Sequence, residues 1–365
     1  MGRLSTLGQH LYEGRVSFDF VGRRTLWYSI SAAIVVLATL AITVRGFNYG
    51  VEFKGGVEFT AQVKTADSAS ADAMAQGVED ADVPEAGDPT VQTSGADTIR
   101  IQTRALTQDQ ATRITTSLQE AGAIEVSQNL IGPTYGKQVA TKALTGLIVF
   151  LVIVVIFIWG YFREWRMSVA AIVALAHDVV ITAGVYALSG FEVTPATVTG
   201  LLTILGYSLY DTVVVFDKVR ENTKGILTST TRTYAEQANL AVNQTLVRSI
   251  NTSITALLPV AALLVVGAGV LGSGPLKDLA LALFVGMAAG TYSSIFIATP
   301  LAVQLKEHDP AIRAQTLRVL ARRAKEADEP VSPVSPTART VRASGAAKRA
   351  QPARKPRSRR GGRGS

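Results

Sequence analysis

Six long apolar runs restrict this chain to a fold built across a lipid bilayer. A helix rises 1.5 Å per residue, so about 20 apolar residues cover the roughly 30 Å of hydrocarbon in a membrane. A helix buried in a soluble protein rarely stays apolar on every face over that length. We therefore predict an α-helical polytopic membrane protein with six transmembrane helices, in Trp27–Val44, Leu144–Tyr161, Val169–Leu188, Ala196–Phe216, Ile254–Leu271 and Leu279–Val303.

The composition excludes several kinds of functional site. Charged residues make up 18% of the 365 residues, below the roughly 25% of soluble domains, and there is no cysteine. Disulfides, thiolate metal sites and a cysteine nucleophile are therefore excluded, and the three histidines lie far apart. The sequence also lacks the phosphate-binding GxxxxGKS/T loop and the HExxH motif. We expect no enzyme activity, cofactor or metal, so any work must come from an ion gradient or a partner.

The placement of lysine and arginine predicts which side of the membrane each loop faces. The N-terminal segment, the link Phe162–Ser168 and the link between the fourth and fifth runs are rich in these residues, whereas Ser189–Pro195 has none. Because cytoplasmic loops carry the excess of Lys and Arg, we predict a cell-membrane protein with both termini in the cytoplasm. We expect the first run to remain as a helix, since no A-x-A-like cleavage site follows Val44.

The loop 45–142 is predicted to be a folded extracytoplasmic domain. It carries 13 acidic against 8 basic residues, and strand and helix patterns alternate along it. The order β-α-β-β-α-β indicates a small α+β domain of the ferredoxin-like type. The expected elements are a strand at Val57–Val63, a helix at Ala69–Ala81, strands at Thr90–Thr93 and Thr98–Thr103, a helix from a Thr107 cap to Ala121, and a strand at Ile124–Gln128.

The chain thus divides into five parts. From Gln304 onward, 16 Lys and Arg stand against 5 Asp and Glu, which accounts for the net charge of +8. An amphipathic stretch at Pro310–Ala327 precedes residues 330–365, whose composition predicts disorder. We expect this tail to bind anionic lipid and no specific nucleic acid. The parts are a cytoplasmic segment 1–26, a first transmembrane helix 27–44, the extracytoplasmic domain 45–142, a five-helix bundle 143–303 and the basic cytoplasmic tail 304–365.

Ionisable side chains inside the spans mark the candidate functional site, because they are costly in hydrocarbon. His177 and Asp178 lie near the middle of the third span, and Asp211 lies in the fourth. Arg248 precedes the fifth span, where it can pair with Asp211 if the two helices are neighbours. Structural alternatives remain open: a static Asp211–Arg248 ion pair, and an interhelical hydrogen-bonding role for His177 and Asp178. Asp217 is expected at a solvated helix end.

Several ordered motifs are specific enough, taken together, to point to one family. They are Phe18–Arg24, Gly50–Gly56, Ala176–Asp178, Gly206–Asn222, Asn243–Ser253 and Phe284–Ser294. With these motifs the chain resembles the SecF members of the SecD/SecF family of protein-export membrane proteins, in the resistance-nodulation-division superfamily, over about residues 16–303. Tyr210 stands where asparagine is common in that family, and Lys218 where arginine is common.

The resemblance implies an accessory function in protein export that uses the proton gradient. It implies a SecD-like subunit, the SecYEG channel and SecA-driven preproteins as partners. It also implies that Asp211 is the proton carrier, Arg248 its switching partner and His177 with Asp178 a secondary part of the relay, while Asp217 is a secondary polar residue. Two alternatives remain open: a proton-driven exporter of small molecules or lipids, and a scaffold that only stabilises the channel.

Overall fold

The computed structural model describes residues 13, 16–267 and 274–328. Residues Met1–Ala321 form one compact unit, and the second unit, Arg322–Ser365, is described only as the end of helix α12 (Pro310–Asp328). This helix coincides with the amphipathic stretch expected at Pro310–Ala327. The predicted disorder of residues 330–365 lies outside the described residues.

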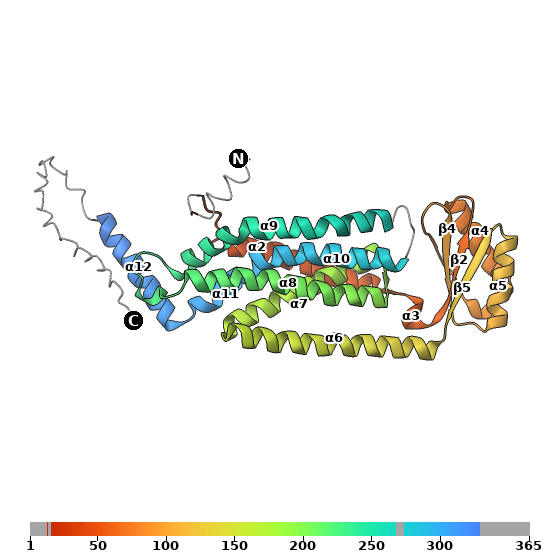
Figure 1. Ribbon diagram of the computed structural model, residues 1–365, viewed down its shortest axis with the longest axis horizontal. Helices are drawn as coiled ribbons and strands as arrows, with labels where there is room; N and C mark the ends of the chain where they lie inside the picture. The colour runs from red at the N-terminus through yellow and green to blue at the C-terminus, as the bar shows by residue number, and fades with distance from the viewer. Residues whose placement is uncertain (1–12, 14–15, 268–273, 329–365) are drawn as a thin grey trace, which may run out of the picture. The chain divides into compact units, whose positions relative to one another are not determined.

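The described residues contain six helices that are long and apolar enough to cross a membrane, and each overlaps one of the predicted runs. Figure 1 shows these helices running alongside one another. The prediction of a six-span membrane protein is therefore confirmed. The spans are α2 (Arg24–Arg45), α6 (Pro133–Phe162), α7 (Trp165–Ser189), α8 (Pro195–Asn222), α9 (Tyr234–Val266) and a last span made of α10 (Gly274–Ser293), the π-helical η4 (Ser294–Ala298) and α11 (Thr299–Glu307).

The start of α9 was predicted wrongly from hydropathy. The apolar run begins at Ile254, whereas the helix begins after Thr233, which forms a reciprocal capping box with Glu236. The polar first half stays helical because its side chains have partners in other segments. Asn243, for example, accepts a hydrogen bond from the Phe18 backbone nitrogen (2.8 Å) and donates one to the Phe18 carbonyl (2.9 Å). This half of α9 therefore holds the segment before α2.

Residues between α2 and α6 form a four-stranded antiparallel sheet with two packed helices, called the sheet domain below (Figure 1). The strand order is β3-β4-β2-β5, and the elements follow one another in the predicted order β-α-β-β-α-β. They are β2 (Gly56–Gln62), α4 (Ser68–Asp80), β3 (Thr90–Thr93), β4 (Thr98–Thr103), α5 (Gln108–Glu120) and β5 (Glu125–Ile131), with the short helix η1 (Pro84–Ala86) between α4 and β3.

Local sequence explains why the sheet domain forms these elements. Val57, Phe59 and Ala61 alternate along β2 and are completely buried, as expected for a strand with one face on a core. Each helix begins at a side-chain cap: Asp67 accepts from the Ser70 backbone nitrogen before α4, and Thr107 forms a capping box before α5. These caps satisfy backbone donors that the first helical turn leaves free.

Besides the chain connections through α2 and α6, the sheet domain contacts the helices at a place that was not predicted from the sequence. The two-residue strand β1 (Asn48–Tyr49) pairs in parallel with β6 (Glu192–Val193), which lies between α7 and α8. Arg100 on β4 adds charged contacts, because its Nη2 lies 2.5 Å from Glu58 Oε2 and 3.3 Å from Glu192 Oε2. Both Arg100 and Glu192 are buried, so this ion pair is shielded from water.

The charge balance around Arg100 is acidic. Glu52, on the short helix α3 (Val51–Lys54), lies near Glu58 and Glu192, and its pKa is raised, mainly by burial and further by these two carboxylates. A guanidinium that neutralises several buried or partly buried carboxylates stabilises them together, whereas its removal leaves like charges facing one another. Arg100 is therefore central to the attachment of the sheet domain.

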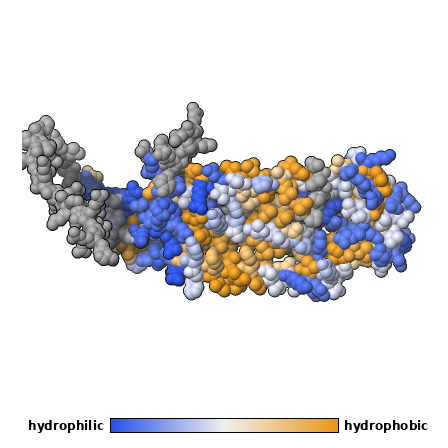
Figure 2. All heavy atoms as spheres, in the orientation of Figure 1, coloured by the Kyte–Doolittle hydropathy of each residue, from blue (hydrophilic) through white to orange (hydrophobic). Residues whose placement is uncertain are grey.

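Surface hydropathy follows the same division of the chain. Figure 2 shows hydrophobic residues gathered over the long helices, with hydrophilic residues over the sheet domain and around α11 and α12. Side chains such as Leu37, Ile156 and Trp159 are more than half exposed on these helices, as expected for residues that face lipid or another membrane segment.

Replacing Arg100 is expected to loosen the attachment of the sheet domain. In Arg100→Ala, Glu192 stays buried without its cation, which typically costs about 3–5 kcal/mol. We expect a lower thermal unfolding midpoint of the purified protein and faster proteolysis between residues 46 and 132. Arg113→Ala, an exposed position on α5, is the control. Equal behaviour of the two variants would show that the ion pair contributes nothing to the attachment.

Candidate functional site

Two buried carboxylates lie inside the helical bundle, one on α7 and one on α8. Asp178 is 1% exposed and Asp211 is 6% exposed. A charged group inside the spans is expensive unless it is paired or hydrogen-bonded. In the described part of the chain, the partners of both carboxylates are mainly serine hydroxyls, with no lysine or arginine in ion-pair contact. This donor set is the central feature of the site.

Asp178 accepts hydrogen bonds from two neighbouring helices. Ser208 of α8 donates to its Oδ2 over 2.6 Å, and Ser293 of α10 donates to the same atom over 2.8 Å. His177 Nδ1 lies 3.2 Å from the other carboxylate oxygen, Oδ1. Asp178 thus joins α7 to α8 and α10 through its hydrogen bonds.

The second ring nitrogen of His177 points to a different environment. Among the described residues, His177 Nε2 is buried without a hydrogen-bond partner. The ring lines an apolar groove of about 440 Å³ between α2, α7 and the last span, together with Tyr28 and Leu301. Tyr292 stacks on the same ring at a centroid distance of 6.1 Å. His177 therefore lies between this groove and the Asp178 carboxylate.

Asp211 has a matching pair of hydroxyl donors. Ser249 of α9 donates to Oδ1 over 2.7 Å, and Ser294, the first residue of η4, donates to Oδ2. The two serines 293 and 294 are consecutive, so neighbouring side chains of one helix reach carboxylates on two different helices. Asp178 and Asp211 are therefore parts of one connected site.

The pair expected between Asp211 and Arg248 is not formed. Ser249 occupies the face of α9 that meets Asp211, and the preceding residue projects about 100° away around the helix. Arg248 is exposed, and its Nη2 lies 3.2 Å from the hydroxyl of Tyr210, which is 52% exposed. The structure thus puts the cation on the outer surface of this chain, beside the residue that precedes Asp211.

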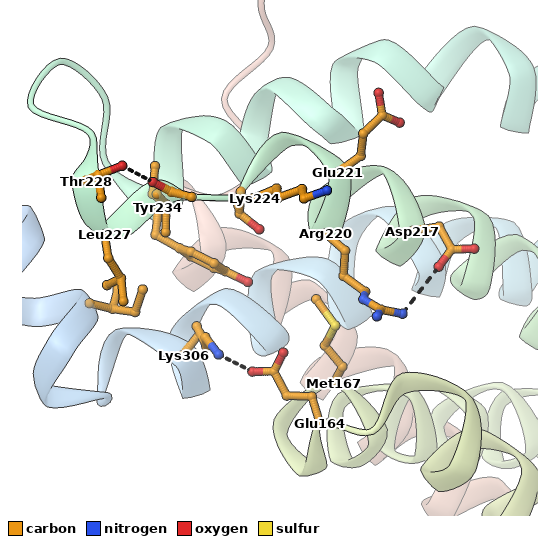
Figure 3. A pocket seen from close by; sticks show the side chains of 14 residues that line it. Glu164, Met167, Asp217, Arg220, Glu221, Lys224, Leu227, Thr228, Tyr234 and Lys306 are labelled. Carbon is orange, nitrogen blue, oxygen red and sulfur yellow. Dashed lines mark hydrogen bonds and ion pairs between the residues drawn. The ribbon is translucent and has the colours of Figure 1, made fainter.

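Asp217 lies apart from the buried site, at the rim of a pocket of about 820 Å³ near the end of α8 (Figure 3). Its side chain is 45% exposed, accepts a hydrogen bond from Tyr161 (2.6 Å) and lies 3.9 Å from Arg220. Across the pocket, Lys306 pairs with Glu164. The charges that line the pocket therefore largely neutralise one another.

Glycines allow α10 to approach α8 closely at the buried site. A Cβ atom on Gly286 would lie 2.0 Å from Ile204 Cδ1, and one on Gly290 would lie 2.8 Å from Ser208 Cβ. A larger residue at position 290 would therefore press on Ser208, which is one of the two serines that bind Asp178. Small residues that let helices approach are common in membrane proteins.

Sequence reasoning found both carboxylates but missed their donors. Ser208, Ser249, Ser293 and Ser294 are each at most 2% exposed, and all four donate to Asp178 or Asp211. The available signal was the occurrence of Ser208, Ser293 and Ser294 inside apolar runs, which also fits simple helix packing, whereas Ser249 lies in the polar segment before the fifth run. No group of three His, Cys, Asp or Glu suited to a metal ion occurs in the parts of the chain that the structure describes.

Comparison with known families identifies the architecture. The family described as protein export membrane protein SecD/SecF, C-terminal, matches residues 111–308, and the SecD/SecF GG motif matches residues 40–67. The chain belongs to the SecD/SecF family. It is 51% identical to the protein translocase subunit SecF of Streptomyces coelicolor, over 89% of this chain and 86% of that protein. It is 46% identical to SecF of Mycobacterium tuberculosis H37Rv, over 87% of this chain and 75% of that protein.

A solved SecDF structure supports the same assignment. The crystal structure of SecDF from Thermus thermophilus, described as a translocon-associated membrane protein, matches with a TM-score of 0.70 and 31% identity. The match covers 80% of this chain but 39% of the SecDF chain, so this SecD/SecF protein spans about two fifths of that relative.

The segment that matches the SecD/SecF GG motif contains two consecutive glycines with positive φ angles, 75° at Gly55 and 151° at Gly56. A Cβ atom on Gly56 would lie 2.5 Å from the carbonyl oxygen of Thr103, and one on Gly55 would lie 2.6 Å from Pro133 Cα. Only glycine fits both the backbone conformation and these contacts. The motif therefore marks where β2 begins against the rest of the sheet domain and the start of α6.

Replacing Gly290 is expected to disturb the buried site by a purely steric route. The new Cβ atom in Gly290→Ala meets Ser208, so Ser208 must move away from Asp178 or α10 must shift. We expect a thermal unfolding midpoint several degrees below that of the unchanged protein. Gly206→Ala on α8 is the control, because nothing lies within 4 Å of its Cβ position. An unchanged midpoint in Gly290→Ala would contradict the close packing described here.

Proposed function

We propose that this chain is an accessory subunit of the protein-export machinery, which uses the proton gradient to promote late steps of export across the cytoplasmic membrane. Its membership of the SecD/SecF family and relatives named protein translocase subunit SecF support this function. These relatives do not favour the alternative of a small-molecule or lipid exporter. The chain is proposed to act as a membrane subunit without enzyme activity of its own.

A SecD-like subunit is the proposed partner within the membrane. The match to 39% of the SecDF chain supports this, since the longer relative contains much that this chain lacks. The exposed Arg248–Tyr210 contact supports it as well, because a cation on the face of a span needs protein or water beside it. The SecYEG channel and SecA-driven preproteins are the further proposed partners, and anionic lipid is the proposed partner of the basic tail.

The sheet domain is proposed to be ferredoxin-like and extracytoplasmic. Its order β3-β4-β2-β5, with every pair antiparallel, is the order that a split β-α-β arrangement produces, and its loop is rich in acidic residues. Both termini are then cytoplasmic. The proposed parts remain those with boundaries at residues 26, 44, 142 and 303.

The observation that supports proton coupling most directly is the presence of two buried carboxylates bound mainly by hydroxyls. A carboxylate only accepts hydrogen bonds, whereas a carboxylic acid also donates one, so gaining a proton changes what each neighbour must do. We propose Asp211 as the proton carrier, with Asp178 and His177 as the second part of the relay and Arg248 as a modulator. A charge that crosses 100 mV gains about 2.3 kcal/mol, enough to shift a balance between helix arrangements.

Asp211→Asn is expected to remove gradient-dependent export while the complex still assembles, because the amide keeps the shape and can accept from Ser249 but cannot ionise. Arg248→Met should reduce this export without abolishing it, since Arg248 contacts Tyr210 and not Asp211. Asp217→Asn, at an exposed rim, is the matched control and should retain export. The measurements are preprotein export into membrane vesicles with and without a proton gradient, and co-purification with the SecD-like subunit.

The outcomes separate proton carriage from scaffolding. Full gradient-dependent export by an assembled Asp211→Asn complex would end the proposal that Asp211 carries the proton. Loss of assembly in Asp211→Asn together with normal export per assembled complex would favour a scaffold. The expected pattern is an assembled Asp211→Asn complex that keeps the export measured without a gradient and loses the additional export that the gradient drives.

The orientation can be tested with single cysteines, because the chain has none of its own. Gln119→Cys lies exposed on α5 of the sheet domain, and Ala314→Cys lies exposed on α12. A membrane-impermeant maleimide added to spheroplasts should label position 119 and leave position 314 unlabelled until the membrane is opened. Equal labelling of the two positions in intact spheroplasts would overturn the proposed topology.

A further inference from the structure

The four serines at the buried site differ in one respect that bears on proton binding. Ser208 and Ser249 each have a carboxylate as their hydrogen-bond acceptor among the described residues. The Ser293 hydroxyl oxygen also lies 3.2 Å from the carbonyl oxygen of Gly290. The Ser294 hydroxyl oxygen likewise lies 3.1 Å from the carbonyl oxygen of Thr291. Only the two consecutive serines of the last span thus have a second acceptor within reach, in the part of the chain that the structure describes.

A second acceptor matters when a carboxylate gains a proton. A charged Asp211 accepts the hydrogen of the Ser294 hydroxyl at Oδ2. If Oδ2 becomes protonated, two hydrogens would face each other unless the serine hydrogen turns elsewhere. Ser294 can turn its hydrogen to the Thr291 carbonyl and accept the new Asp211 O–H with its own oxygen. Every polar hydrogen then keeps an acceptor, and neither backbone has to move.

We infer that Ser293 and Ser294 are positioning residues that reverse their hydrogen bonds when Asp178 and Asp211 gain or lose a proton. The inference rests on the proposed proton coupling and names the residues that allow it. The added proton stays on the carboxyl oxygen, and the serine keeps its own proton throughout, so only the direction of the hydrogen bond changes. Because the two serines are neighbours on one helix, protonation of either carboxylate acts on the same short segment.

The backbone at this segment fits such a role. The π-helical stretch η4 begins at Ser294 and runs to Ala298, inside a span that is otherwise α-helical. Single π-helical turns within helices occur frequently at functional sites, because they interrupt the regular hydrogen-bond ladder. The Ser294 carbonyl accepts from the Thr299 hydroxyl over 3.2 Å, so a side chain supplements the ladder where it changes period.

Other titratable and charged groups lie on the helices around the two carboxylates, so a pH-dependent measurement has to keep these groups unchanged. They are His177 on α7, Tyr207 and Tyr210 on α8, Arg248 on α9, Tyr292 on α10 and Tyr28 on α2. Among them, His177 is in direct contact with a carboxylate. A test of the serines must therefore include variants in which these groups are unchanged.

The test compares the pH profile of gradient-driven export in vesicles for Ser294→Ala, Ser294→Thr and Ser253→Ala, each assembled with the SecD-like subunit. Loss of a hydrogen bond to a charged carboxylate changes its pKa by about one unit or more. The pH midpoint of gradient-driven export should therefore be displaced by about that much in Ser294→Ala. Threonine keeps the hydroxyl and should restore the midpoint. Ser253 is a buried serine on α9 that contacts Tyr207 and Thr291 but neither carboxylate, so its replacement should leave the midpoint unchanged.

Infrared spectroscopy gives a readout that does not depend on export. The carboxylic C=O stretching band of the protonated complex, assigned with Asp211→Asn, should shift in Ser294→Ala and return in Ser294→Thr. The equivalent Ser293→Ala variant should shift the band that Asp178→Asn removes. A band and a pH midpoint that are both unchanged in Ser294→Ala would overturn the inference, as would equal displacement in Ser253→Ala.

The experiments distinguish failure of the role of the serines from failure of the proposed function. If Asp211→Asn keeps gradient-dependent export, proton carriage by Asp211 fails irrespective of the serines. If Asp211→Asn loses this export while Ser294→Ala keeps the original midpoint and band, the proposed function stands and the role of the serines fails. If Ser294→Ala does not assemble, the band in Ser294→Thr and Ser293→Ala decides the matter.

Discussion

The hydrogen bonds that Asp178 and Asp211 accept from serines are the interactions on which the helical bundle depends. Asp178 on α7 accepts from α8 and α10, and Asp211 on α8 accepts from α9 and η4. Hydrocarbon offers no alternative donors, so a bond lost inside the bundle is not replaced by a bond to lipid. The positions of four spans are therefore tied to two carboxylates, and the protonation of those carboxylates is tied to the positions of the spans.

Most of the fold could be predicted from the sequence because it depends on signals that are local or additive. Apolar length alone located all six spans. Strand patterns, an alanine-rich stretch and the Thr107 cap located the strands and helices of the sheet domain. Local signals failed where distant partners decide the structure. The first half of α9 is polar, yet it is helical because Asn243 and its neighbours bind the segment around Phe18. The link between β1 and β6 likewise joins residues far apart in the chain.

The candidate site was predictable only in part, for a geometric reason. A carboxylate inside a span stands out in any sequence, so Asp178 and Asp211 were found. Pairing depends on which residue of the opposite helix faces inward, and one position along a helix changes the direction by about 100°. Ser249 rather than Arg248 faces Asp211, a distinction that charge alone does not reveal. A serine in an apolar run, or in a polar segment such as the one that contains Ser249, is equally compatible with packing, so the donors became visible only with the fold.

Contacts at the two ends of helix α10 connect the buried site with the strand that attaches the sheet domain. Near its start, the carbonyl of Asp278 accepts a hydrogen bond from Tyr186 on α7, and Lys277 lies over the ring of Phe191, next to the strand β6 that holds the sheet domain. Its last residue, Ser293, binds Asp178. These points are 15 residues apart, about 22 Å along a helix axis. α10 therefore connects the buried site with the contacts beside β6, and by geometry a tilt of about 5° around the serines would displace its far end by about 2 Å, a typical helix shift in switching proteins.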